Sequence, residues 1–233
     1  MVAYEGKIYR IGGMAARNAP DEDQNLFSTA RVARYNPALD RWEDLTPLPE
    51  PRSSHDAVVL DGKVYVIGGW TLAGGSAEAK WLDHGWIADL NEPPIKWKPL
   101  PAPPITRRAL AVAATDKQIY AIGGMTRDGF TNAVFRFDPS TQRWSKGPDA
   151  QVKSRFGAFG ISAFGVGPRV WAVGRDGRML YLEDGRDQWT DTGYEIKDGR
   201  IFHRLLSHRD KQLLIVGGAS NGRSPKRRLA RGA

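Results

Sequence analysis

Arginine residues stand just before several apolar runs of this 233-residue chain. Arg52 precedes HDAVVL, Arg107 with Arg108 precedes ALAVAA, and Arg155 precedes FGAFGISAF. A guanidinium group holds a carboxylate through two parallel hydrogen bonds, so several of them gathered at one place would suit an acidic peptide or an anionic sugar. The same side chains could instead bond the backbone of neighbouring segments and serve the fold alone. Both alternatives remain open.

Histidine and tryptophan residues add to this chemistry. His55 and His203 lie in apolar runs of the kind that follow these arginines, and a structural role is the simpler interpretation for both histidines. Trp70 and Trp81 belong to a long segment in which an exposed indole could stack on a sugar ring or fill a partner's pocket, unless it is buried in the fold. The candidate ligand-binding residues are Arg52, His55, Trp70, Arg107, Arg155 and His203.

Other site chemistries find little support in the sequence. The chain has no cysteine, which excludes disulfides and thiolate metal sites. Its four histidines show no metal-binding spacing, and its glycine pairs lack the lysine and hydroxyl residues of a phosphate-binding loop. The acidic trio Asp21-Glu22-Asp23 is typical of a solvated loop. We therefore predict no catalytic residue, no metal site and no cofactor.

The elements that position these residues follow from a repeated block. It occurs five times, as KIYRIGG at 7–13, KVYVIGG at 63–69, QIYAIGG at 118–124, RVWAVGR at 169–175 and QLLIVGG at 212–218. A tryptophan follows each of the first four blocks, and an apolar residue stands seven positions before each tryptophan. These pairs are Tyr35 and Trp42, Leu90 and Trp97, Phe137 and Trp144, and Leu182 and Trp189.

Each repeat predicts four antiparallel strands, which we call a, b, c and d. Strand a follows the arginine, strand b ends at the glycine pair, strand c ends at the apolar mark, and strand d begins at the tryptophan. Strand b is apolar at nearly every position, as expected for a strand covered on both faces. No helical periodicity is present. The sequence therefore predicts an all-β fold, with the four tryptophans mostly buried between neighbouring repeats.

A four-stranded unit that repeats at about 50 residues, with a glycine pair and a spaced tryptophan, resembles the kelch motif of β-propellers. The resemblance covers nearly the whole chain, although Gly174-Arg175 and Leu90 depart from the motif. It implies a kelch-type β-propeller of four-stranded antiparallel blades, with about 4–5 blades, incomplete at both chain ends. In such a blade the b–c and d–a connections share one end, and the b–c connections are long here at 14–27 and 70–80.

The chain ends suggest how the sequence is organised. MVAYEGK aligns without gaps on AVVLDGK at 57–63, so we expect the chain to begin inside a strand a, without a signal peptide. We expect residues 1–218 to form the propeller, as a fragment of a longer one whose parent could be secreted or periplasmic; the compartment is not predicted. Residues 219–233 are basic, and we expect a disordered, solvated tail. No apolar run is long enough for a membrane span.

The leading functional hypothesis is a non-catalytic kelch-repeat module. It would bind a protein segment or an anionic or carbohydrate ligand on the face that carries the long b–c loops, and nucleic acid is not an expected partner. The alternative is a sugar-processing enzyme resembling the kelch-type sialic acid epimerases, against which stands the lack of an acid–base pair. A third possibility is a structural propeller within a larger protein.

Overall fold

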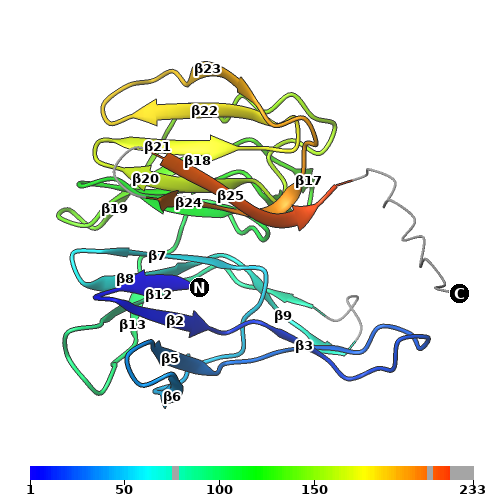
Figure 1. Cartoon of the computed structure of the whole chain (residues 1–233), viewed down its shortest axis with the longest axis vertical. Coiled ribbons are helices and arrows are strands. Elements are labelled where there is room, and N and C mark those ends of the chain that lie inside the picture. Colours follow the sequence, from blue (N-terminus) through cyan, green and yellow to red (C-terminus); the bar gives the residue numbers. More distant parts are fainter. Residues whose placement is uncertain (75–78, 209–211, 221–233) are drawn as a thin grey trace, which may run out of the picture.

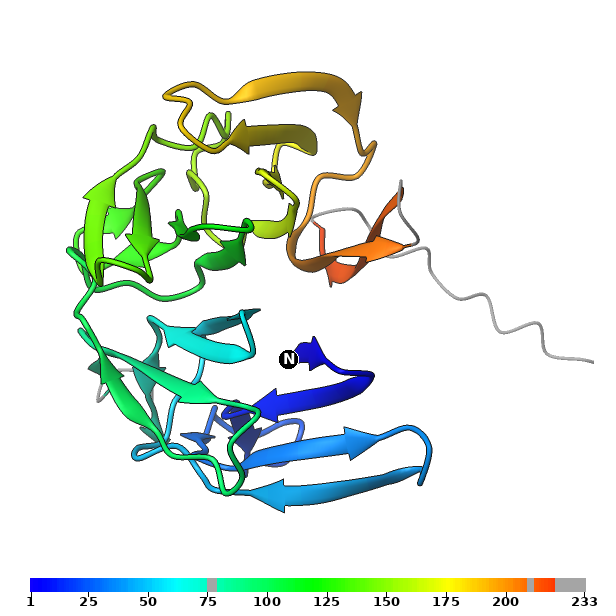
Figure 2. The same ribbon diagram turned by 90° about the vertical axis from the view of Figure 1, so that its left-hand side faces the viewer.

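The fold is a partial ring of antiparallel sheets. A computed structural model describes residues 1–74, 79–208 and 212–220, and within these ranges it contains strands, turns and irregular segments but no helix. Of the eight sheets in the described residues, four have four strands each, and these four together with one two-stranded sheet make up the ring. They follow one another around a central axis, with the N-terminus near the centre of the arc (Figure 2). The predicted all-β kelch-type propeller is confirmed.

Each complete sheet forms one blade, numbered in chain order. Blade 1 contains β1 (Val2–Tyr4), β2 (Lys7–Ile11), β5 (Val32–Asn36) and β6 (Arg41–Leu45). Blade 2 contains β7 (Asp56–Leu60), β8 (Lys63–Ile67), β12 (Gly85–Asp89) and β13 (Lys98–Leu100). Blade 3 contains β14 (Ala111–Ala114), β15 (Ile119–Ile122), β18 (Val134–Asp138) and β19 (Arg143–Lys146). Blade 4 contains β20 (Ser162–Val166), β21 (Arg169–Val173), β22 (Arg178–Glu183) and β23 (Thr190–Glu195).

The fifth sheet is a half-blade made of β24 (Ile201–His208) and β25 (Gln212–Ala219). Its two strands occupy the places of strands a and b. All five repeated blocks therefore form strand b of successive sheets, as predicted. Most of the predicted basic tail, residues 221–233, lies outside the described part of the chain.

Apolar cores lie between neighbouring blades. Val64 and Val66 of blade 2 belong to the core shared with blade 1, whereas Tyr65 and Ile67 belong to the core shared with blade 3. Successive side chains of a strand point to opposite faces, so strand b supplies both neighbouring cores. This alternation explains why strand b is apolar at nearly every position and fully buried from Val64 to Ile67.

The glycine pairs allow neighbouring blades to approach closely. Gly68 has a positive φ of 73°, and a Cβ atom there would lie 2.7 Å from the carbonyl oxygen of Arg107 in the next repeat. Both the backbone conformation and the short distance exclude a larger residue. Gly12 also has a positive φ, and a Cβ atom there would lie 2.6 Å from the carbonyl oxygen of Arg52.

The tryptophans at strand d tie each blade to the preceding one. The indole Nε1 atoms of Trp97, Trp144 and Trp189 donate to the carbonyls of Thr46, Pro101 and Pro148, at distances of 3.1, 2.8 and 3.0 Å. Trp42 is 50% exposed, so its predicted burial is wrong. The reason is that no blade precedes blade 1 in the described part of the chain to cover this indole.

The b–c connections form small sheets of their own at one end of the molecule. β3 (Met14–Ala16), β4 (Leu26–Ser28) and β10 (Ala73–Gly74) make a three-stranded sheet that joins the loops of blades 1 and 2. β9 (Trp70–Thr71) pairs with β11 (Lys80–Trp81), and β16 (Met125–Thr126) with β17 (Gly129–Phe130). Figure 1 shows β3, β9 and β17 at this common end. The described residues include no helix capable of crossing a membrane.

Candidate binding face

We call the end of the propeller formed by the b–c and d–a connections the loop-bearing face. All six predicted site residues lie in or beside these connections, but the structure divides them into buried and surface groups. Arg52, Arg107 and His203 are at most 2% exposed, whereas Trp70 is partly exposed and Arg155 is exposed. His55 lies between the groups, because the residue is partly exposed but its Nδ1 atom is buried. The two groups have different surroundings.

Arg52 and Arg107 bond to the backbone of their own blades. The Nη1 atom of Arg52 donates to the carbonyls of Gly68 and His84, at 3.0 and 2.8 Å. The Nη1 atom of Arg107 donates in the same way to Gly123 and Ala133, at 3.1 and 2.8 Å. Each guanidinium group thus links the end of strand b to the start of strand c, and with almost no exposed surface neither is placed to contact a ligand.

A carboxylate accompanies Arg52. Glu50 accepts a hydrogen bond of 2.9 Å from Nη2 of Arg52 and another from the ring of His84. Partial burial acts to raise the pKa of Glu50, but the bonds from Arg52 and His84 outweigh it and lower that pKa. The ionised carboxylate therefore neutralises the buried Arg52 and fixes the loop of blade 2.

Arg155 does not occupy the corresponding place in blade 4. The backbone amide of Gly69 bonds to the carbonyl of Arg107, and the amide of Gly124 bonds in the same way to Ala158. Ala158 is therefore the structural counterpart of Arg107. The Arg155 guanidinium instead lies on the surface, 4.6 Å from the ring centre of Phe156.

His55 and His203 occupy matching positions in the strand a regions of blade 2 and the half-blade. The Nε2 atom of His55 lies 3.1 Å from the carbonyl oxygen of Ile11, to which it donates. Burial, followed by the charge of Arg52, lowers the pKa of His55 to about 3. Burial also lowers the pKa of His203. Both rings are therefore neutral at physiological pH.

A chain of backbone hydrogen bonds runs around the axis beside these histidines. Ala109 donates to Ser54, Gly160 to Ala109, and Phe202 to Gly160, at 2.8, 2.9 and 2.8 Å. All four residues have a positive φ. They border an axial cavity of about 260 Å³, which Asp56 and Arg204 span with an ion pair of 2.9 Å. The bonded backbone and this ion pair therefore lie together at the axial cavity.

The loop-bearing face also carries stacked aromatic and arginine side chains. Trp70 and Trp81 pack edge to face with ring centres 5.9 Å apart. The guanidinium of Arg108 lies over the Trp70 ring at 3.9 Å and within 5.8 Å of the Phe159 ring centre. Burial lowers the pKa of Arg108. This stack joins the b–c connection of blade 2 to two d–a connections.

A second stack continues the surface toward blade 4. Phe156 lies beneath both Arg155 and Arg175, at 4.6 and 4.8 Å. Phe130 bridges the stacks, because its ring centre is 5.2 Å from those of both Phe156 and Phe159. We define the aromatic–arginine patch as Trp70, Trp81, Arg108, Arg127, Phe130, Arg155, Phe156, Phe159 and Arg175.

The patch carries positive charge without internal neutralisation. Among residues 1–74, 79–208 and 212–220, none of its four arginines forms an ion pair with a carboxylate. Aromatic rings hold the guanidinium planes. Nη2 of Arg108 donates to the sulfur of Met125 at 3.2 Å and its Nε is buried, so Nη1 is the group of Arg108 that remains for a ligand. The patch can therefore accept carboxylate groups, with apolar surface beside them.

Sequence reasoning identified only part of this patch. Trp70 and Arg155 belong to it, and Trp81 and Arg108 were noted but not chosen as site residues. The members that were missed are Arg127, Phe130, Phe156, Phe159 and Arg175. The sequence does show aromatic and arginine residues close together in the b–c and d–a connections. They were not chosen because the candidate residues were taken mainly from positions that recur in each repeat.

Comparison with known proteins places the chain in a family. Residues 1–175 match the model of the KLHDC2/KLHL20/DRC7 Kelch-repeats domain. Kelch-like protein 35 of Mus musculus is 26% identical over 64% of this chain and 22% of its own length. Beta-scruin of Limulus polyphemus is 23% identical over 94% of this chain and 24% of its own length. The chain thus spans about a quarter of the length of these relatives.

A solved structure shows the same fold. The structure of YjhT superimposes with a TM-score of 0.73, covering 94% of this chain and 76% of YjhT at 19% identity. The family match includes the glycine pairs and tryptophans of blades 1 to 3, which the structure shows at equivalent positions. This chain belongs to the kelch-repeat family of β-propellers.

Proposed function

We propose that the protein is a binding module that recognises an acidic segment of another protein through the aromatic–arginine patch. The observation that carries this proposal is the set of four arginines, each held on an aromatic ring and none paired with a carboxylate of a described residue. Like charges at one surface repel, and an acidic partner would relieve that repulsion. A protein segment also has apolar side chains to cover Trp70 and Phe130.

The test is a titration with a labelled Glu-rich peptide that contains apolar residues. Arg155→Gln and Arg108→Gln should each weaken binding about tenfold or more, because a hydrogen bond to a charged group contributes roughly 1.5–3 kcal/mol. Affinity should also fall as the salt concentration rises. Arg143→Gln is the matched control, since Arg143 is exposed and begins β19, away from the loop-bearing face.

Three outcomes would overturn the proposal. Equal weakening by Arg143→Gln, or no binding, would remove the patch as the site. Binding of uronic or sialic sugars without binding of the peptide would replace the protein segment by an anionic carbohydrate, and turnover of that sugar would identify a sugar-processing enzyme.

A further inference from the structure

Blade 4 departs from the repeat at two places on the loop-bearing face. Its block ends in Gly174-Arg175, whereas the other four blocks end in a glycine pair. The d–a connection that leads into blade 4 has Ala158 at the place that Arg107 holds in blade 3. The two departures adjoin, because the backbone amide of Lys153 donates to the carboxylate of Asp176, the neighbour of Arg175, at 2.7 Å.

A different backbone course in this connection accommodates Arg175. In blade 2 the d–a connection forms a bridge to the b–c connection through Ser53 and Trp70. A Cβ atom at Gly69 would lie 2.5 Å from the carbonyl oxygen of Ser53, so the second residue of that pair must be glycine. In blade 4, residues 155–160 form turns instead. The position that requires glycine in blade 2 therefore holds an arginine in blade 4.

Both departures bring a guanidinium group to one aromatic ring. The Cζ atoms of Arg155 and Arg175 lie 4.6 and 4.8 Å from the ring centre of Phe156, so one ligand group can reach both side chains. We call Arg155 and Arg175 the blade 4 arginine pair. Phe130 is 43% exposed and its ring centre lies 5.2 Å from that of Phe156. Two positive charges and an apolar surface are thus side by side.

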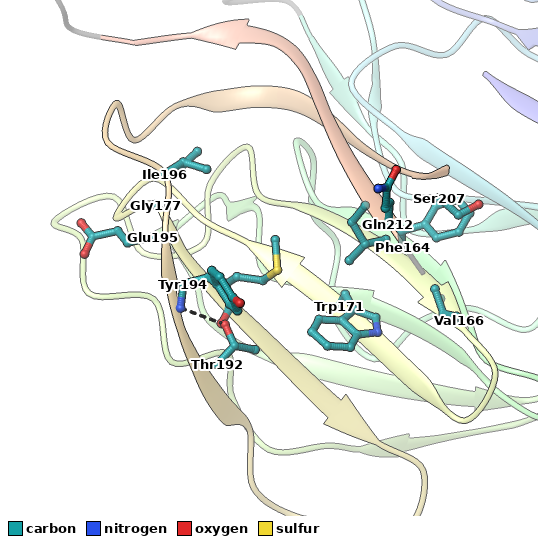
Figure 3. Close-up of a pocket in the computed structure, with 13 residues that line it drawn as sticks. Phe164, Val166, Trp171, Gly177, Thr192, Tyr194, Glu195, Ile196, Ser207 and Gln212 are labelled. Carbon is teal, nitrogen blue, oxygen red and sulfur yellow. Dashed lines mark hydrogen bonds between the residues drawn. The ribbon is translucent and has the colours of Figure 1, made fainter. Parts of the chain in front are cut away.

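The carboxylates closest in the chain fold do not neutralise this pair. Asp176 accepts the amide of Lys153, and its carboxylate approaches Nη1 of Arg178 at 3.9 Å. Figure 3 shows Glu195 beside Gly177, where β23 ends. Within the described ranges, neither carboxylate forms an ion pair with the blade 4 arginine pair. A ligand that compensates the pair must supply about two negative charges at one point.

We propose that the blade 4 arginine pair binds the phosphate group of a phosphorylated residue in the acidic segment, an inference that rests on the proposed function. A phosphate monoester carries roughly 1.5–2 negative charges at pH 7 and three acceptor oxygens, enough for two guanidinium groups at once. A carboxylate has two oxygens in one plane, which a single guanidinium fork fills. The other arginines of the patch remain for neighbouring carboxylates, and Phe130 for an apolar side chain. Phosphorylation of the partner therefore strengthens binding.

Two labelled peptides of equal length test this inference on the full chain. The first is Glu-rich with two adjacent glutamates at its centre, and in the second phosphoserine and alanine replace these two residues, so the net charges are about equal. The phosphopeptide should bind about tenfold more tightly than the Glu-rich peptide. In Arg175→Gln this ratio should fall to about one, because a single guanidinium group remains for the phosphate. Arg155→Gln, at an exposed position, should reduce the ratio in the same way.

Two control variants separate this inference from the proposed function. Arg186→Gln should leave both affinities unchanged, because Arg186 is exposed between β22 and β23, at the opposite end of blade 4. Arg108→Gln should weaken both peptides and preserve their ratio. Equal affinity for the two peptides, or a ratio that neither Arg175→Gln nor Arg155→Gln reduces, would overturn the phosphate site, while binding of the Glu-rich peptide would still support the proposed function. Capture by vesicles containing phosphatidylinositol phosphates without binding of the phosphopeptide would also overturn it, and would assign the pair to a membrane lipid.

Discussion

At the scale of single residues, the arginines fall into two classes that composition does not separate. Arg107 and Arg108 are neighbours, yet Arg107 is buried against backbone carbonyls and Arg108 lies on Trp70. The two side chains point in opposite directions because successive side chains of an extended segment alternate between its two faces. Arg52 and Arg107 each stand four positions before strand a, but Arg155 stands seven before β20. If the start of β20 had been predicted correctly, this longer interval would have shown from the sequence that Arg155 differs from Arg52 and Arg107.

His55 gives a prediction about acid stability. Its folded pKa is about 3, well below the value of about 6.5 expected in the unfolded chain. Below about pH 6.5 the unfolded state therefore binds a proton that the folded state excludes, and the free energy of unfolding falls as the pH falls. His55→Gln should reduce this slope between about pH 6 and 4, by up to about 1.4 kcal/mol per pH unit.

Urea unfolding at several pH values measures this effect. His208→Gln is the control, because His208 is exposed at the end of β24. The assignment would be refuted if wild type and His55→Gln lost stability in parallel on acidification.

At the scale of elements, the apolar runs and glycine pairs were enough to predict strand b in every blade. The short strands of the b–c connections could not be predicted, because β9, β10 and β11 have only two residues each. β10 exists through its pairing with β4 of another blade's loop, which local sequence does not encode. The same reasoning explains Trp42, since its spacing is that of a buried tryptophan and its exposure depends on the neighbouring blade.

Replacing the tryptophans of strand d by alanine should therefore reduce the free energy of unfolding by unequal amounts. Trp189 is 5% exposed and bonded to Pro148, so Trp189→Ala should reduce the free energy of unfolding by about 3–5 kcal/mol. Trp42→Ala should cost less than about 1 kcal/mol, because half of that side chain is already exposed. Denaturant unfolding of the two variants compares them directly, and equal losses would contradict the described packing.

At the scale of the whole molecule, the repeat predicted the architecture but not the composition of the candidate binding face. The patch brings together Trp70, Arg108 and Phe159, which are distant in sequence and meet only because successive blades turn around one axis. The shared end of the b–c and d–a connections was predictable from antiparallel topology. Which side chains stack there depends on loop conformations that no repeat position fixes.

Buried arginines support the propeller, and we propose that surface arginines on aromatic rings bind its partner. The most direct test measures both stability and affinity for the Glu-rich peptide in Arg107→Met and Arg155→Gln. Arg107→Met should lose about 2–4 kcal/mol of stability, because it leaves the carbonyls of Gly123 and Ala133 without their donor, yet its folded form should keep wild-type affinity. Arg155→Gln should unfold within about 0.5 kcal/mol of wild type and bind about tenfold more weakly. Lost affinity in folded Arg107→Met together with unchanged affinity in Arg155→Gln would contradict the claim.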